Sequence, residues 1–145
     1  MPRLIVAEPP GAYHVRPPMV IDSSLMIAFL FHEENARDAE MRMDGRALHA
    51  PQLIDLEVAN ACRNRVRSKL VTLDAARESL NDFLQLDVER HDIDIRATFD
   101  LASRYGLTAY DASYLWLAHQ LAAPLATFDE ALGKAATEYF SEQSA

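Results

Sequence analysis

The sequence has little cysteine, no excess of positive charge and no long hydrophobic run, and each shortage excludes a class of protein. The single cysteine, Cys62, cannot form an intrachain disulfide, which favours a reducing compartment such as the cytoplasm. Prolines interrupt residues 1–20, which have no continuous apolar core, so this segment predicts neither a signal peptide nor a membrane span. We therefore expect a cytoplasmic protein with no attachment to a membrane.

The 145 residues carry a net charge of -8 and are 50% hydrophobic. A chain of this length buries about two thirds of its unfolded surface and fits one domain rather than two. The negative charge argues against an ordinary nucleic-acid binder, because Lys and Arg contacts to phosphate normally supply most of the non-specific affinity. A nucleic-acid substrate would therefore require positive charge from bound metal ions, a local basic patch or a basic partner protein.

The order of predicted elements indicates an α/β fold. We interpret the proline-rich residues 1–18 as an N-terminal extension and residues 19–145 as the domain. Short strands are expected over residues 19–21, 47–49, 86–88 and 124–127. Helices are expected over residues 25–31, 51–69, 72–84, 94–105 and 110–121, with a further charged helix ending near residue 44. This alternation predicts a three-layer α/β/α sandwich with a mostly parallel central sheet and a functional crevice at the carboxyl ends of the strands.

Four acidic residues occupy positions that are unusual for surface charges. Asp22 and Asp129 each follow a predicted strand, so both belong to the carboxyl rim of the sheet. Glu57 interrupts the inward-facing stripe of its helix, and Asp111 opens a helix that is apolar almost all round. Because a carboxylate on an inward-facing stripe needs a partner or a cation, Glu57 is the acid that most requires an explanation.

Each acid also has a purely structural interpretation. Asp22 could cap the helix over residues 25–31, and Asp111 could complete a capping box begun by Thr108. Asp129 could be a first-turn acid in a helix that Thr127 caps. Glu57 is the hardest to explain in this way, although Arg63 or Arg65 could pair with it.

The joint pattern is more specific than any single acid. One acid lies in each of four blocks, in this order: residues 20–24 (VIDSS), 51–61 (PQLIDLEVANA), 107–114 (LTAYDASY) and 125–132 (LATFDEAL). These blocks resemble the four signature blocks of PIN domains, and the resemblance extends from about Met19 to the C-terminus. Matched block by block, it implies four metal-binding acids and two supporting hydroxyls, on Asp22, Glu57, Asp111, Asp129, Ser23 and Thr127.

Within that family the chain is similar to the VapC-type toxins of toxin–antitoxin pairs. The similarity implies a metal-dependent endoribonuclease that forms a homodimer. It also implies a small cognate antitoxin whose C-terminal segment covers the acidic groove.

The predicted ligand set favours Mg²⁺ or Mn²⁺ as the cofactor, because all of the ligands are oxygen acids. Two like charges about 4 Å apart repel by about 4 kcal/mol at an effective dielectric near 20, so converging carboxylates need a cation or protons. A bound ion can activate a water and stabilise the leaving oxygen of a phosphodiester. The expected products are a 5′ phosphate and a 3′ hydroxyl.

Basic residues and histidines are the other candidates for a role in the same chemistry. Four cations follow Glu57 on its helix and could guide an RNA backbone, although cations are also favoured at a helix C-terminus: Arg63, Arg65, Arg67 and Lys69. The histidines show no paired metal-ligand spacing and no nearby nucleophile: His14, His32, His49, His91 and His119. We therefore expect no acid–base catalysis by histidine.

Three other classes of protein compete with this interpretation. A receiver-like module would need a Lys on a late strand, but Lys134 lies in the predicted last helix. A haloacid-dehalogenase-type phosphatase would need an acid in place of Ser24. A PIN-like or receiver-like domain that acts as a non-catalytic binding module stays open as the alternative.

Overall fold

One five-stranded sheet organises the computed structural model, which describes residues 1–10 and 16–144. The strand order is β1-β5-β2-β3-β4, and the strands are β1 (Ile5–Ala7), β2 (Pro18–Ile21), β3 (Ala47–Pro51), β4 (Val88–His91) and β5 (Leu125–Thr127). β2 runs parallel to β3 and β5, and β3 runs parallel to β4, whereas β1 is antiparallel to β5. The predicted mostly parallel sheet is confirmed.

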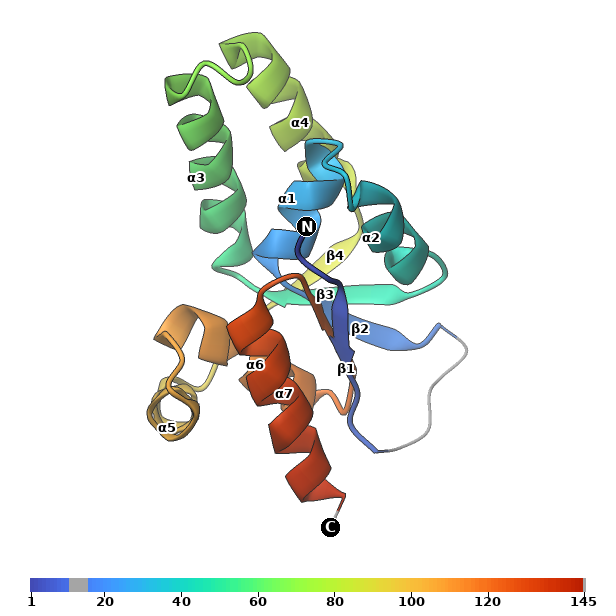
Figure 1. Cartoon of the computed structure of the whole chain (residues 1–145), viewed down its shortest axis with the longest axis vertical. Helices are drawn as coiled ribbons and strands as arrows, with labels where there is room; N and C mark the ends of the chain where they lie inside the picture. The colour runs from blue at the N-terminus through green and yellow to red at the C-terminus, as the bar shows by residue number, and fades with distance from the viewer. Residues whose placement is uncertain (11–15, 145) are drawn as a thin grey trace.

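Helices cover both faces of this sheet. They are α1 (Ser23–Leu30), α2 (Ala36–Met43), α3 (Ile54–Arg67), α4 (Leu73–Gln85), α5 (Ile95–Tyr105), α6 (Ala109–Gln120) and α7 (Glu130–Gln143). Figure 1 shows α1 to α4 on one side of the sheet and α5 to α7 on the other. The predicted three-layer α/β/α arrangement is therefore correct. Within the described part of the chain, no helix is both long enough and apolar enough to cross a membrane.

The central strand β2 shows why the sheet is buried. Met19, Val20 and Ile21 are completely inaccessible to solvent, with no polar residue alternating among them. A strand that is covered on both faces needs apolar side chains on both, so its sequence is a continuous apolar run. Helix α6 is buried through its middle, from Ala112 to Ala118 apart from the half-buried Trp116, as its apolar composition predicted.

The N-terminal extension contributes a strand that the sequence did not predict. Ile5 lies opposite Thr127 in the β1–β5 pair, and β1 also packs against α7. The Gly133 position on α7 allows this approach, because a Cβ there would lie 2.5 Å from Cδ1 of Ile5. The division of the chain at residue 18 stays a prediction. Because β1 belongs to the sheet, we expect removal of residues 1 to 18 to cost stability. Residues 11–15 lie outside the described part.

Two predicted boundaries near the site were wrong. Pro51 does not begin a helix but ends β3, opposite His91, and α3 begins three residues later at Ile54. β4 extends through residues 88–91 rather than 86–88, because the amide of Leu86 still bonds to the carbonyl of Phe83 at the end of α4. The second shift matters because it places His91 within the sheet.

Candidate functional site

Asp22 lies directly after the central strand, at the N-cap of α1. It is only 3% exposed and accepts hydrogen bonds from the backbone amide of Leu25 at 3.1 Å and from Oγ of Ser24 at 2.7 Å. Thr127 donates a third hydrogen bond to the other carboxylate oxygen. Burial raises the pKa of Asp22 to about 6, although the hydrogen bonds from Thr127 and Ser24 oppose the shift. Asp22 thus caps a helix and is also a carboxylate that is costly to ionise.

Glu57 lies in the first turn of α3, and its partner comes from the buried helix α6. The hydroxyl of Tyr114 donates to Oε1 of Glu57 at 2.5 Å. Burial raises the pKa of Glu57, while hydrogen bonds from Tyr114 and Ser23 lower it. Burial and the charge of Glu57 raise the pKa of Tyr114, so the phenol keeps its proton and remains a donor. The partner of Glu57 is thus Tyr114 rather than Arg63 or Arg65, either of which the sequence left open.

Asp111 and Asp129 lie at the starts of α6 and α7. Thr108 caps α6 and accepts a hydrogen bond from the amide of Asp111 at 3.1 Å, which is half of the expected capping box. Asp129 itself caps α7 by accepting from the amide of Leu132 at 2.8 Å, so the expected cap at Thr127 is wrong. Burial raises the pKa of Asp111, and the charge of Asp129 adds to the shift.

The electrostatic effects show that the four predicted acids are neighbours. Asp111 raises the pKa of both Asp22 and Glu57, and Asp129 raises that of Asp111. No three of these acids bring their oxygens within 4.8 Å of one another, as far as the described residues show. The acids therefore share one electrostatic field without forming a closed coordination shell. Carboxylates and hydroxyls surround this space, and such an oxygen-only donor set fits Mg²⁺ or Mn²⁺.

Two hydroxyls connect the acids from the first and last blocks. Thr127 is fully buried, donates to Asp22 and accepts from the backbone amide of Asp129 at 2.9 Å. Ser24 donates to Asp22 and accepts from the amide of Phe128 at 3.0 Å. The resemblance indicated Ser23 and Thr127, so Ser24 was missed. Its two-residue spacing from Asp22 was the available signal, since a hydroxyl in the first turn of a helix can reach the N-cap side chain.

The basic residues of α3 differ from one another in their surroundings. Arg65 pairs with Glu33 at 2.8 Å and lies over the ring of Phe31 at 4.3 Å. Arg63 and Arg67 are exposed and line a largely apolar groove between α3 and α4. Lys69 follows the end of α3 with a φ of 58°. Arg65 is therefore engaged with other side chains, whereas Arg63, Arg67 and Lys69 extend from the surface.

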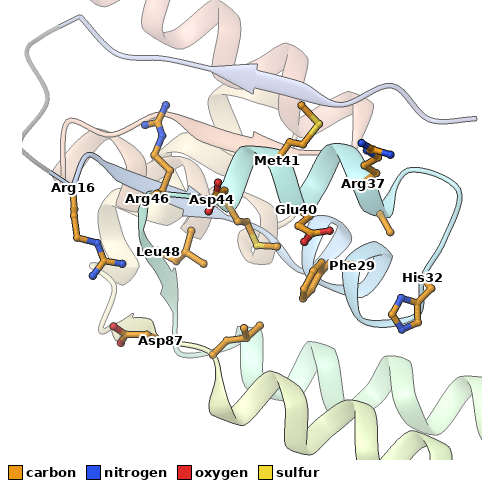
Figure 2. Close-up of a pocket in the computed structure, with 14 residues that line it drawn as sticks. Arg16, Phe29, His32, Arg37, Glu40, Met41, Asp44, Arg46, Leu48 and Asp87 are labelled. Carbon is orange, nitrogen blue, oxygen red and sulfur yellow. The ribbon is translucent and has the colours of Figure 1, made fainter.

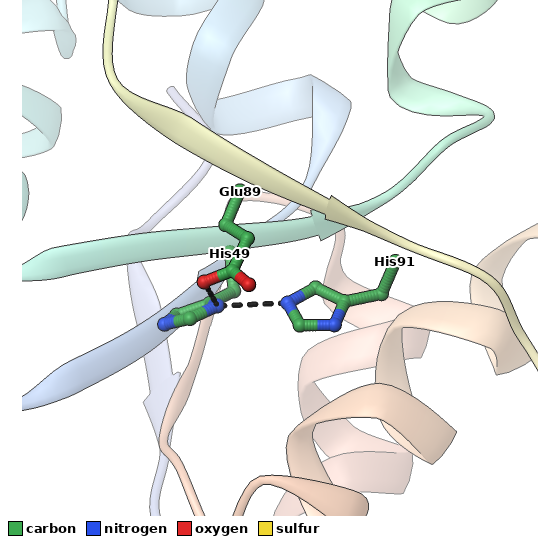
Figure 3. Close-up of side chains that lie close together, drawn as sticks. All are labelled: His49, Glu89 and His91. Atoms are coloured by element: carbon green, nitrogen blue, oxygen red, sulfur yellow. Dashed lines mark hydrogen bonds and ion pairs between the residues drawn. The ribbon is translucent and has the colours of Figure 1, made fainter.

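A cluster of three residues that the sequence did not indicate lies on β3 and β4 (Figure 3). Nδ1 of His49 is 2.8 Å from Nε2 of His91 and 3.4 Å from Oε2 of Glu89. Burial lowers the pKa of His49, and the neighbouring His91 lowers it further. The available signal was the two-residue spacing of Glu89 and His91, which puts both side chains on one face of a strand. His14 lies outside the described residues.

A broad pocket occurs at the opposite end of the sheet from the acids. Figure 2 shows its lining, in which Arg16 precedes β2, Leu48 lies near the start of β3 and Asp87 precedes β4. These positions mark the amino ends of the strands, while Asp22 and Asp129 follow carboxyl ends. The lining contains none of the four acids, so this pocket is separate from the candidate site.

Fold and site together define an α/β protein that carries a carboxylate site at the carboxyl rim of a mostly parallel sheet. Residues 19–138 match the protein family described as PIN domain. The chain therefore belongs to the PIN-domain family.

Individual relatives agree with this assignment. The chain is 31% identical over 121 residues to "Ribonuclease VapC3" of Pyrobaculum aerophilum. This alignment covers 80% of this chain and 92% of the relative. It is 31% identical over 111 residues to "Ribonuclease VapC9" of Mycobacterium tuberculosis, covering 77% and 85% of the two chains. The crystal structure of PAE2754 from Pyrobaculum aerophilum matches with a TM-score of 0.67 at 22% identity, covering 88% of this chain and 89% of that one. This last likeness supports the fold alone.

Proposed function

We propose that the chain is an endoribonuclease and the toxin of a toxin–antitoxin pair, and that it hydrolyses RNA phosphodiester bonds with the help of Mg²⁺ or Mn²⁺. One observation carries the proposal: hydrogen bonds through Thr127 and Tyr114 connect the segments that hold the four acids, since Thr127 contacts Asp22 and Asp129, and Tyr114 of the helix that begins with Asp111 contacts Glu57. Similarity to relatives that are named ribonucleases supports it.

In this proposal the four acids, Asp22, Glu57, Asp111 and Asp129, hold the metal. A bound ion would supply an activated water and would neutralise charge on the departing 3′ oxygen. Tyr114 orients Glu57 by donating a hydrogen bond to its Oε1. Thr127 and Ser24 hold Asp22 in a single orientation, and Thr127 also fixes the backbone of Asp129.

Positive charge for binding RNA would come from the far end of α3. The start of this helix holds Glu57, and Arg67 lies ten residues further on, which corresponds to about 15 Å at 1.5 Å per residue. Arg63, Arg67 and Lys69 extend from this end and are suited to contact phosphates at a distance from the acids. Arg65 is a weaker candidate, because it already pairs with Glu33.

The partners follow from the same proposal. A net charge of -8 and an acidic site favour a basic segment in the antitoxin that covers it. A homodimer acting in the cytoplasm remains a prediction from the family resemblance. A non-catalytic PIN-like binding module is the alternative, and it predicts RNA or protein binding without cleavage.

Cleavage of total RNA by the purified chain tests the proposal. We expect cleavage to stop in EDTA and to return with Mg²⁺ or Mn²⁺. Asp111→Asn should abolish it, whereas the matched control Asp82→Asn, at an exposed acid of α4, should not. Cleavage that persists in EDTA would contradict the metal mechanism. RNA binding without cleavage in any metal would favour the non-catalytic alternative.

A further inference from the structure

Three side chains that the proposed function does not use converge on one face of the sheet. His49 lies opposite Glu89 in the parallel β3–β4 register, and His91 follows two residues later on β4. Because side chains two residues apart on a strand share a face, Glu89 and His91 both project toward the side of His49. Figure 3 shows the two imidazole rings and the carboxylate directed toward one another.

The separations among these three side chains correspond to those of ligands around one ion. One donor atom from each residue lies within 4.8 Å of the other two, and this is the only such trio of His, Cys, Asp or Glu residues found in the described ranges. Ligands about 2.1 Å from a tetrahedral zinc ion are themselves about 3.4 Å apart. The distance of 3.4 Å from Nδ1 of His49 to Oε2 of Glu89 equals that value, and the hydrogen-bond distance of 2.8 Å between the two ring nitrogens is shorter than it.

The donor chemistry differs from that of the four acids. Two imidazole nitrogens and one carboxylate suit borderline ions such as Zn²⁺, while Mg²⁺ prefers oxygen alone. The ring-to-ring hydrogen bond occupies one N–H, and a change of tautomer in neutral imidazole frees that nitrogen's lone pair for a metal. No net proton has to leave for this exchange.

The cluster is also accessible. The side chain of Glu89 is 67% exposed and that of His49 is 13% exposed, so the carboxylate lies at the solvent side and the ring at the inner side. β4 is the edge strand of the sheet, which leaves one flank of the cluster without a neighbouring strand. An ion can therefore enter from the solvent, and one coordination position remains for water.

We propose that His49, Glu89 and His91 form a binding site for a borderline divalent transition metal ion, for which Zn²⁺ is the reference ligand. The ion would link β3 to the edge strand β4 through three protein ligands. Its site shares no residue with the four acids of the proposed nuclease centre.

The position of the cluster gives the ion a structural consequence. The amide of Gln52 donates to the carbonyl of His91 at 3.1 Å, and Arg90 on the same strand pairs with Asp55 of α3 at 2.9 Å. The end of β4 is thus attached to the residues that begin α3. A metal that holds β3 and β4 together should therefore stabilise the folded chain by mass action.

Zinc binding by the full chain, in the presence of excess Mg²⁺, tests the proposal. The bound metal is measured after dialysis by atomic emission, and Co²⁺ is used in parallel for its visible absorption. We expect the wild type to retain one Zn²⁺ and to melt at a higher temperature with it. His49→Gln and His91→Gln should each weaken binding by at least about tenfold, since loss of even an outer partner of a metal site costs that much.

Two further variants keep the result interpretable. Glu89→Gln changes an exposed side chain, so it should fold and still bind Zn²⁺ more weakly. His32→Asn is the matched control, because His32 is exposed, lies outside the cluster and has a φ of 51° that Asn tolerates. This control should bind Zn²⁺ like the wild type.

Two outcomes would overturn the proposal. One is a wild type that retains no Zn²⁺ in excess Mg²⁺. The other is equal Zn²⁺ binding by the wild type and by Glu89→Gln and both histidine variants, which would leave His49 and His91 as a hydrogen-bonded pair only. Because the readout is metal content rather than RNA cleavage, neither outcome depends on the four acids.

Discussion

The carboxylate site and the histidine cluster lie on the same sheet but are assembled in different ways. The four acids come from four separated segments, and each lies at a helix N-cap or in a first helical turn. The three residues of the histidine cluster come from two neighbouring strands and already touch one another. At the carboxylate site, the starts of helices bring together charges that repel one another. At the histidine cluster, the strand register brings together two rings that share a hydrogen bond.

In this structure the kind of donor atom at each site therefore corresponds to the way in which the site is assembled. Repelling carboxylates are tolerated where hydrogen bonds from Thr127, Ser24 and Tyr114 hold them in place. A pair of neutral imidazoles needs no such support. We therefore expect the two sites to separate in function, with RNA cleavage dependent on the acids and zinc binding dependent on the histidines.

The largest expected effect is on cleavage. Asp22→Asn should lower the rate of RNA cleavage by at least about 1,000-fold, because a metal ion supplies several kcal/mol of transition-state stabilisation. His49→Gln should leave that rate within about twofold in Mg²⁺. Rates measured on one RNA under identical conditions compare the two variants. A large loss in His49→Gln, in a protein that melts normally, would show that the two sites are coupled.

The next effect is a pH dependence of opposite sign at the two sites. The pKa of Asp22 rises from 3.8 unfolded to about 6 folded, so between these values the folded state holds a proton that the unfolded state has lost. The free energy of unfolding of the metal-free protein therefore falls as pH rises through this window, by about 3 kcal/mol in total. The pKa of His49 is lowered from 6.5, so its contribution to stability increases as pH rises toward 6.5.

Urea denaturation in EDTA across this pH range separates the two contributions. As pH rises from about 4 to 6, the unfolding free energy of the wild type should fall relative to that of Asp22→Asn. The same comparison with His49→Gln should change in the opposite direction. Parallel curves for wild type and Asp22→Asn would show that Asp22 ionises normally in the folded protein.

A smaller effect concerns β1, which lies next to Asp129 and at the opposite edge of the sheet from β4. Gly133→Ala should lower the free energy of unfolding by about 1 kcal/mol, since overpacking against Ile5 outweighs the better helix propensity of alanine. In a chain that starts at Met19 the same substitution should instead stabilise. Zinc binding should be unchanged in the full chain. Stabilisation of the full chain by Gly133→Ala, measured by urea denaturation, would show that β1 does not pack on α7.

The features predicted correctly from the sequence are those with a local pattern. The run Met19 to Ile21, followed at once by Asp22, indicated a buried strand and a rim acid without knowledge of any other segment. The apolar composition of α6 likewise indicated a buried helix. For the four acids, the order of the blocks indicated one shared site, which no single acid could indicate.

The features that were missed depend on contacts between distant segments. Tyr114 lies in a helix that was expected to be buried, and its bond to Glu57 joins residues 57 positions apart in two helices. His49 and His91 come together only through the β3–β4 register, 42 positions apart. The strand at Ile5 is three residues long within a proline-rich segment, so it has no periodicity to detect.

Thermal melts of wild type and Asp22→Asn across a Mg²⁺ titration test whether Asp22 belongs to a metal-holding set of acids. Without metal the variant should melt at the higher temperature, because it removes a buried charge. Mg²⁺ at 100 times its dissociation constant should stabilise the wild type by about 2.7 kcal/mol, and the variant should lose most of this gain, so that the two curves converge or cross. Equal stabilisation of both proteins by Mg²⁺ would exclude Asp22 from the metal ligands and would contradict the proposed four-acid metal site.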